Sequence, residues 1–465
     1  MTTGMVALRR EPGTAWIGAA LVGLAMGLLV AWTPLVAVAA IAAIVGILVI
    51  VTRAELALLV MIAALPWENK LDFPSETFSA VKGIGALVML AYVLRLLGNR
   101  QTKLQLSPVH AIVACFGTWI LLSLTVSPEP LEGTQKTARW ILLLAFFFLV
   151  TQLITDRRQI RSALRWFTGS AAAAAAYGLW LFVVQHYTRV SGPLLDPNDF
   201  GYQLACALPI NAYLIGADRG RRPLWMVCFV LISLATLGTL SRGALVGIGA
   251  LIVWGVCTRR IPLWAVASGL ATTLAVLALA LTVWSPLIDL AIHEKTHIAQ
   301  RNTESREVFW SAALKLTERR PLTGVGPGRY PHEAQPLVQN NSPIALKEPE
   351  THNTYLEILA ENGAPALLLF AAYLIAAWLS LRSVQQRAKR DDDRDEQRLA
   401  TALQGALLIA MVSAIFLSAE LTSPFWLLGG LAVVLLRSGS LEHASRPETG
   451  MALAKQRSHL PAASV

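Results

Sequence analysis

Long apolar runs recur along almost the whole chain and constrain its fold more than any other feature. Each run has about 15 to 25 residues, the length at which an α-helix crosses roughly 30 Å of hydrocarbon. Because no water is present there, every backbone N–H and C=O must be paired within helices or within a closed barrel. The runs show no alternation typical of barrel strands, so the sequence predicts an all-α integral membrane protein.

The composition agrees with a membrane protein. Of 465 residues, 55% are hydrophobic and only 15% are charged, and the mean hydropathy is +0.54. Two runs, 54–66 and 243–257, are short enough to be half-buried or re-entrant, so we expect about 12–14 transmembrane helices. The candidate spans are about 15–32, 34–52, 54–66, 78–97, 108–126, 137–154, 163–186, 199–216, 222–240, 243–257, 262–284, 354–381, 400–419 and 424–437.

One mostly polar segment interrupts the apolar pattern and divides the chain. We expect an N-terminal transmembrane bundle over 1–284, a large extracytoplasmic loop over 285–353, C-terminal transmembrane helices over 354–440 and a cytoplasmic tail over 441–465. Within the loop, SREVFWSAALKLTERR carries apolar residues at helical spacing, which predicts a short amphipathic helix against the membrane face.

The orientation follows from basic residues, which concentrate in alternate short loops. Placing both termini in the cytoplasm puts most of these cations inside and puts the large loop outside. The net charge of +10 is then a topology signal with some attraction to anionic membrane lipids, and no nucleic acid is needed to explain it. We expect the charged cluster from Asp391 to Glu396 to form a solvated loop.

Two short motifs in the large loop invite other interpretations. HEKTH has the H-E-x-x-H spacing that places His293 and His297 around zinc, with Glu294 as a base. Such a short pattern arises easily by chance, and a polar loop segment is the simpler interpretation. The glycines of TGVGPGRY lack a following GK[ST], so we interpret them as a sharp turn rather than a phosphate loop.

Three residues at the outer surface indicate chemistry on a phosphate. Arg242 lies between two apolar segments, where a charge is costly unless it lines a polar cavity or binds an anion. Arg189 lies at the outer end of a span and reads either as an interfacial arginine or as a second anion contact. His352 stands where a polar run becomes a helix, as an interfacial group or a base. Guanidinium groups bind phosphate bidentately, so a lipid-linked phosphate is the expected substrate, with His352 deprotonating an acceptor hydroxyl.

Four segments in order resemble the O-antigen ligase and polymerase superfamily: TRVSGPLLDPND, TLSRGALVG, SREVFWSAALKLTERRPLTGVGPGRY and THNTYLEILAENGAPAL. The resemblance covers roughly residues 180–375. It implies a membrane glycosyltransferase that moves a glycan from undecaprenyl diphosphate to an acceptor hydroxyl with inversion, without a metal or another cofactor.

The resemblance also implies roles for individual residues. His352 matches the histidine that activates the acceptor, and Arg189 and Arg242 match the arginines that contact the donor diphosphate. The candidate further substrate contacts are Arg306, Arg329, Tyr355 and Glu361. The expected location is the bacterial cytoplasmic (inner) membrane, with the active site facing the periplasm or cell exterior.

Several alternatives remain open at the level of sequence. A ligase and a polymerase share the donor and differ in the acceptor, which is a lipid core sugar or a growing glycan. A transporter of a lipid-linked glycan would also use intramembrane arginines, without bond chemistry. The zinc protease interpretation of His293, Glu294 and His297 is the last alternative. The sequence does not indicate an oligomeric state.

Overall fold

The computed structural model describes residues 53–70, 80–98, 104–128, 130–194, 196–264, 267, 271, 306–339, 350–419 and 421–445. Every regular element in these ranges is helical, and six of the helices are long and apolar enough to cross a membrane. The predicted all-α membrane fold is therefore confirmed. The predicted spans 15–32 and 34–52, and almost all of 262–284, lie outside the described residues, so the total of about 12–14 spans stays a prediction.

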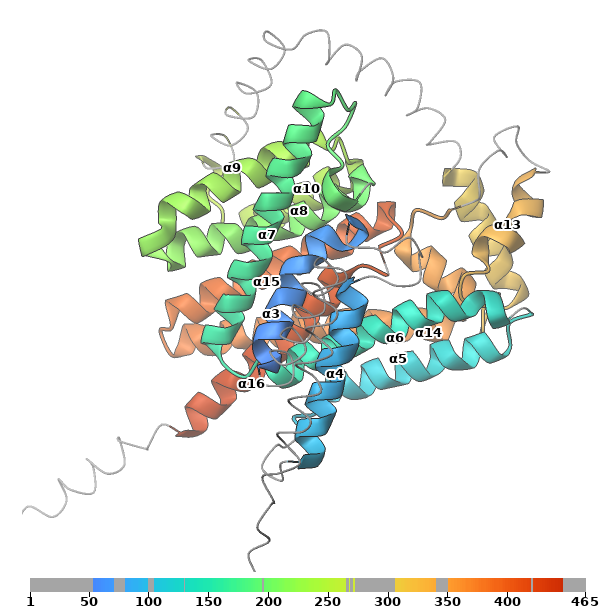
Figure 1. The fold of residues 1–465 in the computed structure, drawn as a ribbon, viewed down its shortest axis with the longest axis horizontal. Helices are drawn as coiled ribbons and strands as arrows, with labels where there is room; N and C mark the ends of the chain where they lie inside the picture. Colours follow the sequence, from blue (N-terminus) through green and yellow to red (C-terminus); the bar gives the residue numbers. More distant parts are fainter. Residues whose placement is uncertain are drawn as a thin grey trace, which may run out of the picture.

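The helices match the predicted spans closely within the described part (Figure 1). A helix over 306–319 confirms the amphipathic helix expected in the large loop. The other elements are α3 (Ala54–Ala64), η1 (Leu65–Lys70), α4 (Ala80–Gly98), α5 (Pro108–Thr125), α6 (Pro130–Leu153), α7 (Arg157–Val184), η2 (Gly192–Leu194), α8 (Pro197–Ala217), η3 (Arg219–Arg221), α9 (Arg222–Gly238), α10 (Arg242–Cys257), α13 (Tyr330–Gln339), α14 (Thr354–Arg390), α15 (Arg394–Ser413), η4 (Ala414–Phe416) and α16 (Ser423–Ser445).

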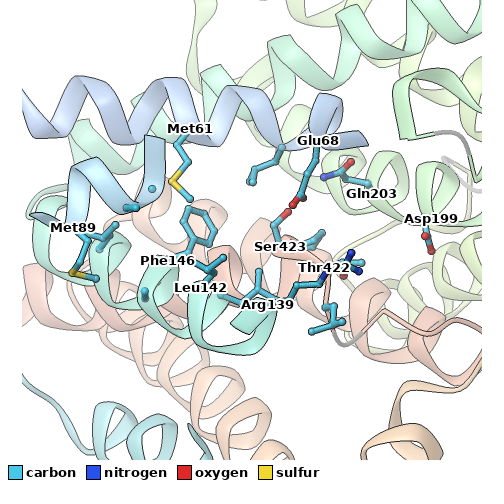
Figure 2. Close-up of a pocket in the computed structure, with 18 of the residues that line it drawn as sticks. Met61, Glu68, Met89, Arg139, Leu142, Phe146, Asp199, Gln203, Thr422 and Ser423 are labelled. Carbon is cyan, nitrogen blue, oxygen red and sulfur yellow. The ribbon is translucent and has the colours of Figure 1, made fainter. Parts of the chain in front are cut away.

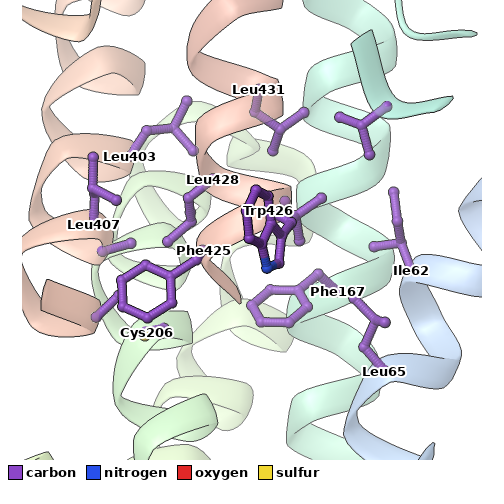
Figure 3. Packing of buried hydrophobic residues seen from close by; sticks show 14 of the residues in the cluster. Ile62, Leu65, Phe167, Cys206, Leu403, Leu407, Phe425, Trp426, Leu428 and Leu431 are labelled. Atoms are coloured by element: carbon purple, nitrogen blue, oxygen red, sulfur yellow. The ribbon is translucent and has the colours of Figure 1, made fainter. Parts of the chain in front are cut away.

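Helix α16 lies at the centre of the bundle. Every residue from Ser423 to Leu435 is buried, and α16 packs against α6, α14 and α15. A helix that is apolar on all sides is typical of a protein core or of a membrane span, and here other helices surround it. Figure 3 shows Phe425 and Trp426 among residues of the neighbouring helices, and the Trp426 ring stacks on Tyr373 of α14 with ring centroids 4.9 Å apart.

Helix α14 is longer than predicted, and its far end belongs to an ion-pair network. It continues past residue 381 to Arg390, and a short turn leads into α15. Arg157 of α7 contacts Asp393 at 2.5 Å and Glu396 at 3.2 Å, and Arg387 contacts Glu396 at 2.9 Å. Glu396 is only 1% exposed, so the expectation of a solvated loop is wrong for Glu396, whereas Asp391, Asp392 and Arg394 are exposed as expected. Apolar periodicity could not reveal these charges, because their partners come from a distant helix.

A break in α14 at Gly363 is filled by the glycine-rich turn of the large loop. Gly363 has φ 79° and ψ 176°, which interrupts the helical hydrogen bonds. The turn supplies hydrogen-bond donors at this break. The Val325 and Gly326 amides donate to the carbonyls of Ala360 and Glu361, both at 2.9 Å. Ala364 in turn donates to the Pro321 carbonyl at 2.8 Å.

The glycines of this turn are therefore structural, as predicted. Gly324, Gly326 and Gly328 have φ values of 67°, 106° and 74°, the left-handed region that glycine adopts without penalty. The turn fastens the large loop to the middle of α14.

Candidate functional site

His352 directly precedes the N-cap of α14 and is held in an unusual backbone conformation. Its φ is 45°, which is uncommon for a residue with a side chain. The residues on both sides are clamped: Trp310 donates through Nε1 to the Thr351 carbonyl at 2.9 Å. The amide and the hydroxyl of Thr354 both donate to the Leu417 carbonyl at 2.8 Å. Such over-determined strain is typical of functional positions.

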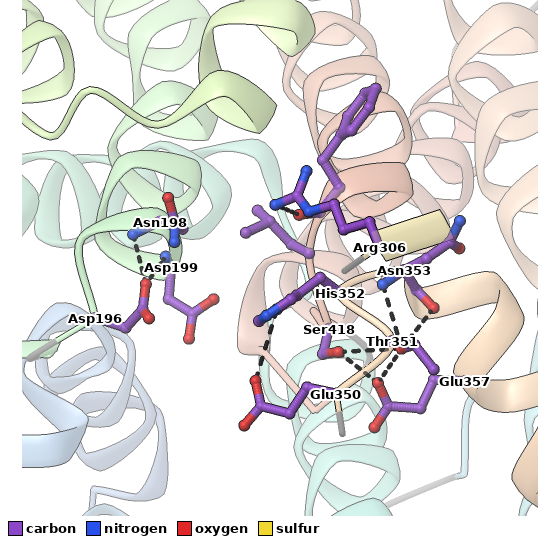
Figure 4. A network of polar contacts seen from close by, with 12 residues as sticks. Asp196, Asn198, Asp199, Arg306, Glu350, Thr351, His352, Asn353, Glu357 and Ser418 are labelled. Atoms are coloured by element: carbon purple, nitrogen blue, oxygen red, sulfur yellow. Dashed lines mark hydrogen bonds and ion pairs between the residues drawn. The ribbon is translucent and has the colours of Figure 1, made fainter. Parts of the chain in front are cut away.

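The imidazole of His352 is partly exposed and has a carboxylate beside it (Figure 4). Nδ1 lies 3.6 Å from Oε2 of Glu350, and the His352 side chain is 39% exposed. Glu350 lies within electrostatic reach of Asp199 in the first turn of α8, so the histidine faces a group of acids. Nδ1 is therefore the ring nitrogen that lies next to the Glu350 carboxylate.

Arg189 is held firmly between two segments. Its Nε donates to the Thr239 carbonyl and its Nη2 to Oδ1 of Asn198, each at 2.8 Å. Burial lowers the pKa of Arg189, although the nearby charge of Asp196 opposes this shift. Asp196 itself caps α8 by accepting from the Asn198 and Asp199 amides, as expected. Because two protein groups hold the guanidinium in place, we do not interpret Arg189 as a simple headgroup anchor.

Arg242 and Arg306 lie near each other, although about sixty residues separate them in sequence. Arg242 begins α10 and is exposed, and Ser241 caps that helix. Burial lowers the pKa of Arg306, and so does the positive charge of Arg242. Arg306 also donates to the Phe416 carbonyl at 3.4 Å. Two like charges held together attract an anion, and Arg189 contacts the carbonyl of Thr239, three residues before Arg242.

The remaining candidate contacts have clear structural partners. Arg329 is 6% exposed and pairs with Glu333 at 3.5 Å. The Tyr355 hydroxyl donates to the Met411 carbonyl at 2.7 Å. Glu361 is 1% exposed and lies at the break in α14. The structure therefore places Arg329 and Glu361 around the glycine turn, apart from the arginine pair.

Lys136 of α6 is the residue that the sequence analysis missed. Its Nζ lies 2.5 Å from Oε1 of Glu357 and 2.8 Å from Oε2 of Glu361. Glu357 also accepts hydrogen bonds from Thr351, at 2.8 Å, and from Ser418. The two glutamates stand at positions i and i+4 of α14, and this spacing was the available signal for a shared cation. Lys136 thus ties α6 to the turn that carries His352.

An elongated cavity of about 720 Å³ opens beside this network (Figure 2). It lies between α3, α4, α6, α8 and the start of α16. Asp199 and Ser418 belong both to its lining and to the surroundings of His352.

The zinc motif cannot be compared with this site. His293, Glu294 and His297 lie outside the described residues. Among the residues that the structure describes, no group of three or more histidines, cysteines, aspartates or glutamates is arranged to hold a metal ion.

Comparison with known proteins supports the O-antigen ligase superfamily. Residues 227–371 match the family model described as O-antigen ligase. In this region the chain is similar to members of that superfamily. The matched region contains Arg242, Arg306 and His352, whereas Arg189 precedes it. The resemblance predicted from the four sequence motifs is therefore confirmed.

One characterised relative extends the comparison. The chain is 26% identical over 281 residues to an O-antigen ligase of Pseudomonas aeruginosa. The alignment covers 58% of this chain and 64% of the relative, so the chain spans less than two thirds of the relative's length. Similarity to this superfamily fits the long apolar helices of a multi-pass membrane protein.

Proposed function

We propose that the protein transfers a glycan from undecaprenyl diphosphate to an acceptor hydroxyl at the outer face of the bacterial inner membrane. The observation that carries this proposal is the placement of His352. Neighbouring contacts hold it in a left-handed conformation just before the N-terminus of α14. The paired charges of Arg242 and Arg306 and the fixed guanidinium of Arg189 support it. The name of the Pseudomonas aeruginosa relative favours a ligase over a polymerase.

In the proposed reaction His352 acts as the general base. Nε2 takes the proton of the acceptor hydroxyl as its oxygen attacks the anomeric carbon. The bond from that carbon to the diphosphate oxygen breaks on the opposite face, so the configuration inverts. The electron pair leaves with undecaprenyl diphosphate, whose charge Arg189 and Arg242 stabilise. Arg306 is placed to assist, and Arg329, Tyr355 and Glu361 hold the surrounding backbone.

The test compares two histidines with the same backbone conformation. His352→Asn removes the imidazole but keeps a residue that tolerates positive φ. His186→Asn is the matched control, because His186 is exposed and has φ 54°. Purified protein in nanodiscs receives a labelled lipid-linked glycan and an acceptor, and covalent product is counted. We expect His352→Asn and Arg242→Ala to lower the rate by on the order of a thousandfold or more, and His186→Asn to retain it.

The products also separate the alternatives. Attachment to a lipid core sugar identifies a ligase, whereas elongation of a lipid-linked glycan identifies a polymerase. Lipid movement across the bilayer without a covalent product would identify a transporter and contradict the proposal. A chelator should leave the rate unchanged, whereas a zinc site would make the rate depend on zinc and on His293. Full activity of His352→Asn would refute the assigned base.

A further inference from the structure

The cavity between α3, α4 and α6 changes character along its length. Figure 2 shows Glu68, Arg139, Asp199 and Gln203 toward one end, with Thr422 and Ser423, whereas Met61, Met89, Leu142 and Phe146 lie toward the other. Its volume of about 720 Å³ is within the range of about 300–1,000 Å³ common to ligand sites. The proposed proton transfer uses none of the residues at the apolar end.

Along α6, and along α3 with η1, the side chains that line the cavity change from polar at one end to apolar at the other. On α6 the lining residues Arg139, Leu142, Phe146 and Leu149 recur every three or four positions, so they share one helix face. On the α3 side the lining runs from Met61 and Leu65 to Glu68. From Arg139 to Leu149 the axial rise is about 15 Å, half of the roughly 30 Å hydrocarbon thickness. The lining of the cavity therefore runs from a polar rim along a length of α6 equal to about half the hydrocarbon thickness.

The polar rim is continuous with the candidate site. Ser418 lines the cavity and donates a hydrogen bond to Glu357, which also accepts from Thr351 beside His352. Asp199 lines the same rim and lies within electrostatic reach of Glu350. A lipid bound for transfer at His352 would therefore have the cavity next to it.

We infer that this cavity seats the first isoprene units of the donor lipid. The inference rests on the proposed function, which supplies the diphosphate headgroup at the arginines. The polar rim carries the Arg139 guanidinium together with the carboxylates of Glu68 and Asp199. The apolar end offers methionine, leucine and phenylalanine side chains, and methionine adapts to irregular chains. The rest of the chain passes from the cavity into the bilayer.

The cavity orients the donor lipid more than it increases the affinity for it. An isoprenoid chain leaves lipid, not water, when it enters the cavity, so no hydrophobic gain accompanies the transfer. Packing against α4 and α6 instead fixes the diphosphate and the anomeric carbon relative to His352, and small misplacements at a reacting centre have large effects on rate.

The first experiment fills the cavity from α6. Leu142→Trp places a large ring in it, and Ile141→Trp is the matched control because Ile141 is 38% exposed and is not among the residues that line it. Both are assayed with a donor that carries the full-length isoprenoid chain and with a donor whose chain is a single isoprene unit. We expect Leu142→Trp to lower kcat for the full-length donor about tenfold, which corresponds to about 1.4 kcal/mol, and to lower kcat for the single-unit donor much less. Ile141→Trp should leave both kcat values unchanged.

Equal kcat values of Leu142→Trp and Ile141→Trp with the full-length donor would overturn the inference while leaving the proposed function intact. No transfer by the wild-type protein from any lipid-linked donor would overturn the proposed function itself.

A second experiment does not depend on how Leu142→Trp folds. A photoreactive amino acid replaces Met89, which lines the apolar end of the cavity, in the full-length protein. We expect illumination to attach the long-chain donor lipid to this position, and excess unlabelled long-chain donor to compete. Attachment to residues 1–52 of the same chain, without lipid, would show that a protein segment fills the cavity and would overturn the inference.

Discussion

At the scale of single residues, the site depends on how His352 is held. A histidine with φ 45° stays in place only because its neighbours leave the backbone no alternative. Thr354 is central to this restraint: it is fully buried, its hydroxyl donates to the Leu417 carbonyl, and it accepts from the Ala419 amide at 2.8 Å. Thr354 is therefore a positioning residue rather than a catalytic one.

The hydroxyl of Thr354 can be tested directly. Thr354→Val keeps the shape of the side chain but leaves the Ala419 amide without this partner, so the segment around His352 should shift. We expect kcat to fall about tenfold to a hundredfold, with KM for the donor changing much less. Thr354→Ser retains the hydroxyl and should restore most of kcat. An equal loss in both variants would show that the methyl group matters, not the hydrogen bonds.

At the scale of elements, the junction between α14 and the glycine turn joins the large loop to the bundle. Gly363 has φ 79°, and a Cβ at this position would overlap the carbonyl of Leu322. Trp119 of α5 adds to the junction by donating to the Asn362 carbonyl at 3.0 Å. Lys136, which joins α6 to Glu357 and Glu361, fastens the same turns of α14 from another side.

Gly363→Ala should therefore destabilise the junction. Strain at a left-handed position and overpacking each amount to about 1–3 kcal/mol, so we expect a loss of roughly 2–6 kcal/mol in the free energy of unfolding. Gly249→Ala in α10 is the control, because a Cβ there meets no atom within 4 Å. Thermal unfolding in detergent and protease sensitivity of the large loop measure the difference. Equal melting temperatures for the two variants would contradict the packing described here.

At the scale of the whole molecule, α14 separates two polar ends of the bundle. Its 37 residues, broken at Gly363, run from the site at Thr354 to the ion-pair network at Arg390. In that network, burial tends to raise the pKa of the Asp393 carboxyl. Hydrogen bonds from the Glu396 amide and from Arg157 outweigh this effect and hold the pKa below its usual value.

A lowered folded-state pKa means that Asp393 stabilises the fold at neutral pH, and that this contribution is lost as the pH falls through the folded-state pKa, below about pH 4. Asp393→Ala should remove about 1 kcal/mol at pH 7, as expected for a helix N-cap, and reduce the loss of melting temperature on acidification. Asp391→Ala, at an exposed neighbouring position, is the control. If the melting temperature of Asp393→Ala fell more steeply on acidification than that of the wild type, the inferred direction of the Asp393 pKa shift would be wrong.

Sequence patterns alone predicted the membrane class, most helix positions in the described part, the amphipathic loop helix and the resemblance to the superfamily. These depend on local periodicity and on contiguous motifs such as THNTYLEILAENG. The fold was needed to show that the charges of Arg242 and Arg306 interact, that Glu357 and Glu361 share Lys136, and that Asp393 and Glu396 pair with Arg157. The cavity beside α6 was likewise hidden, because its walls come from helices far apart in sequence. Pairing of charges and shape of a cavity depend on distances between helices, and a one-dimensional pattern carries no such distances.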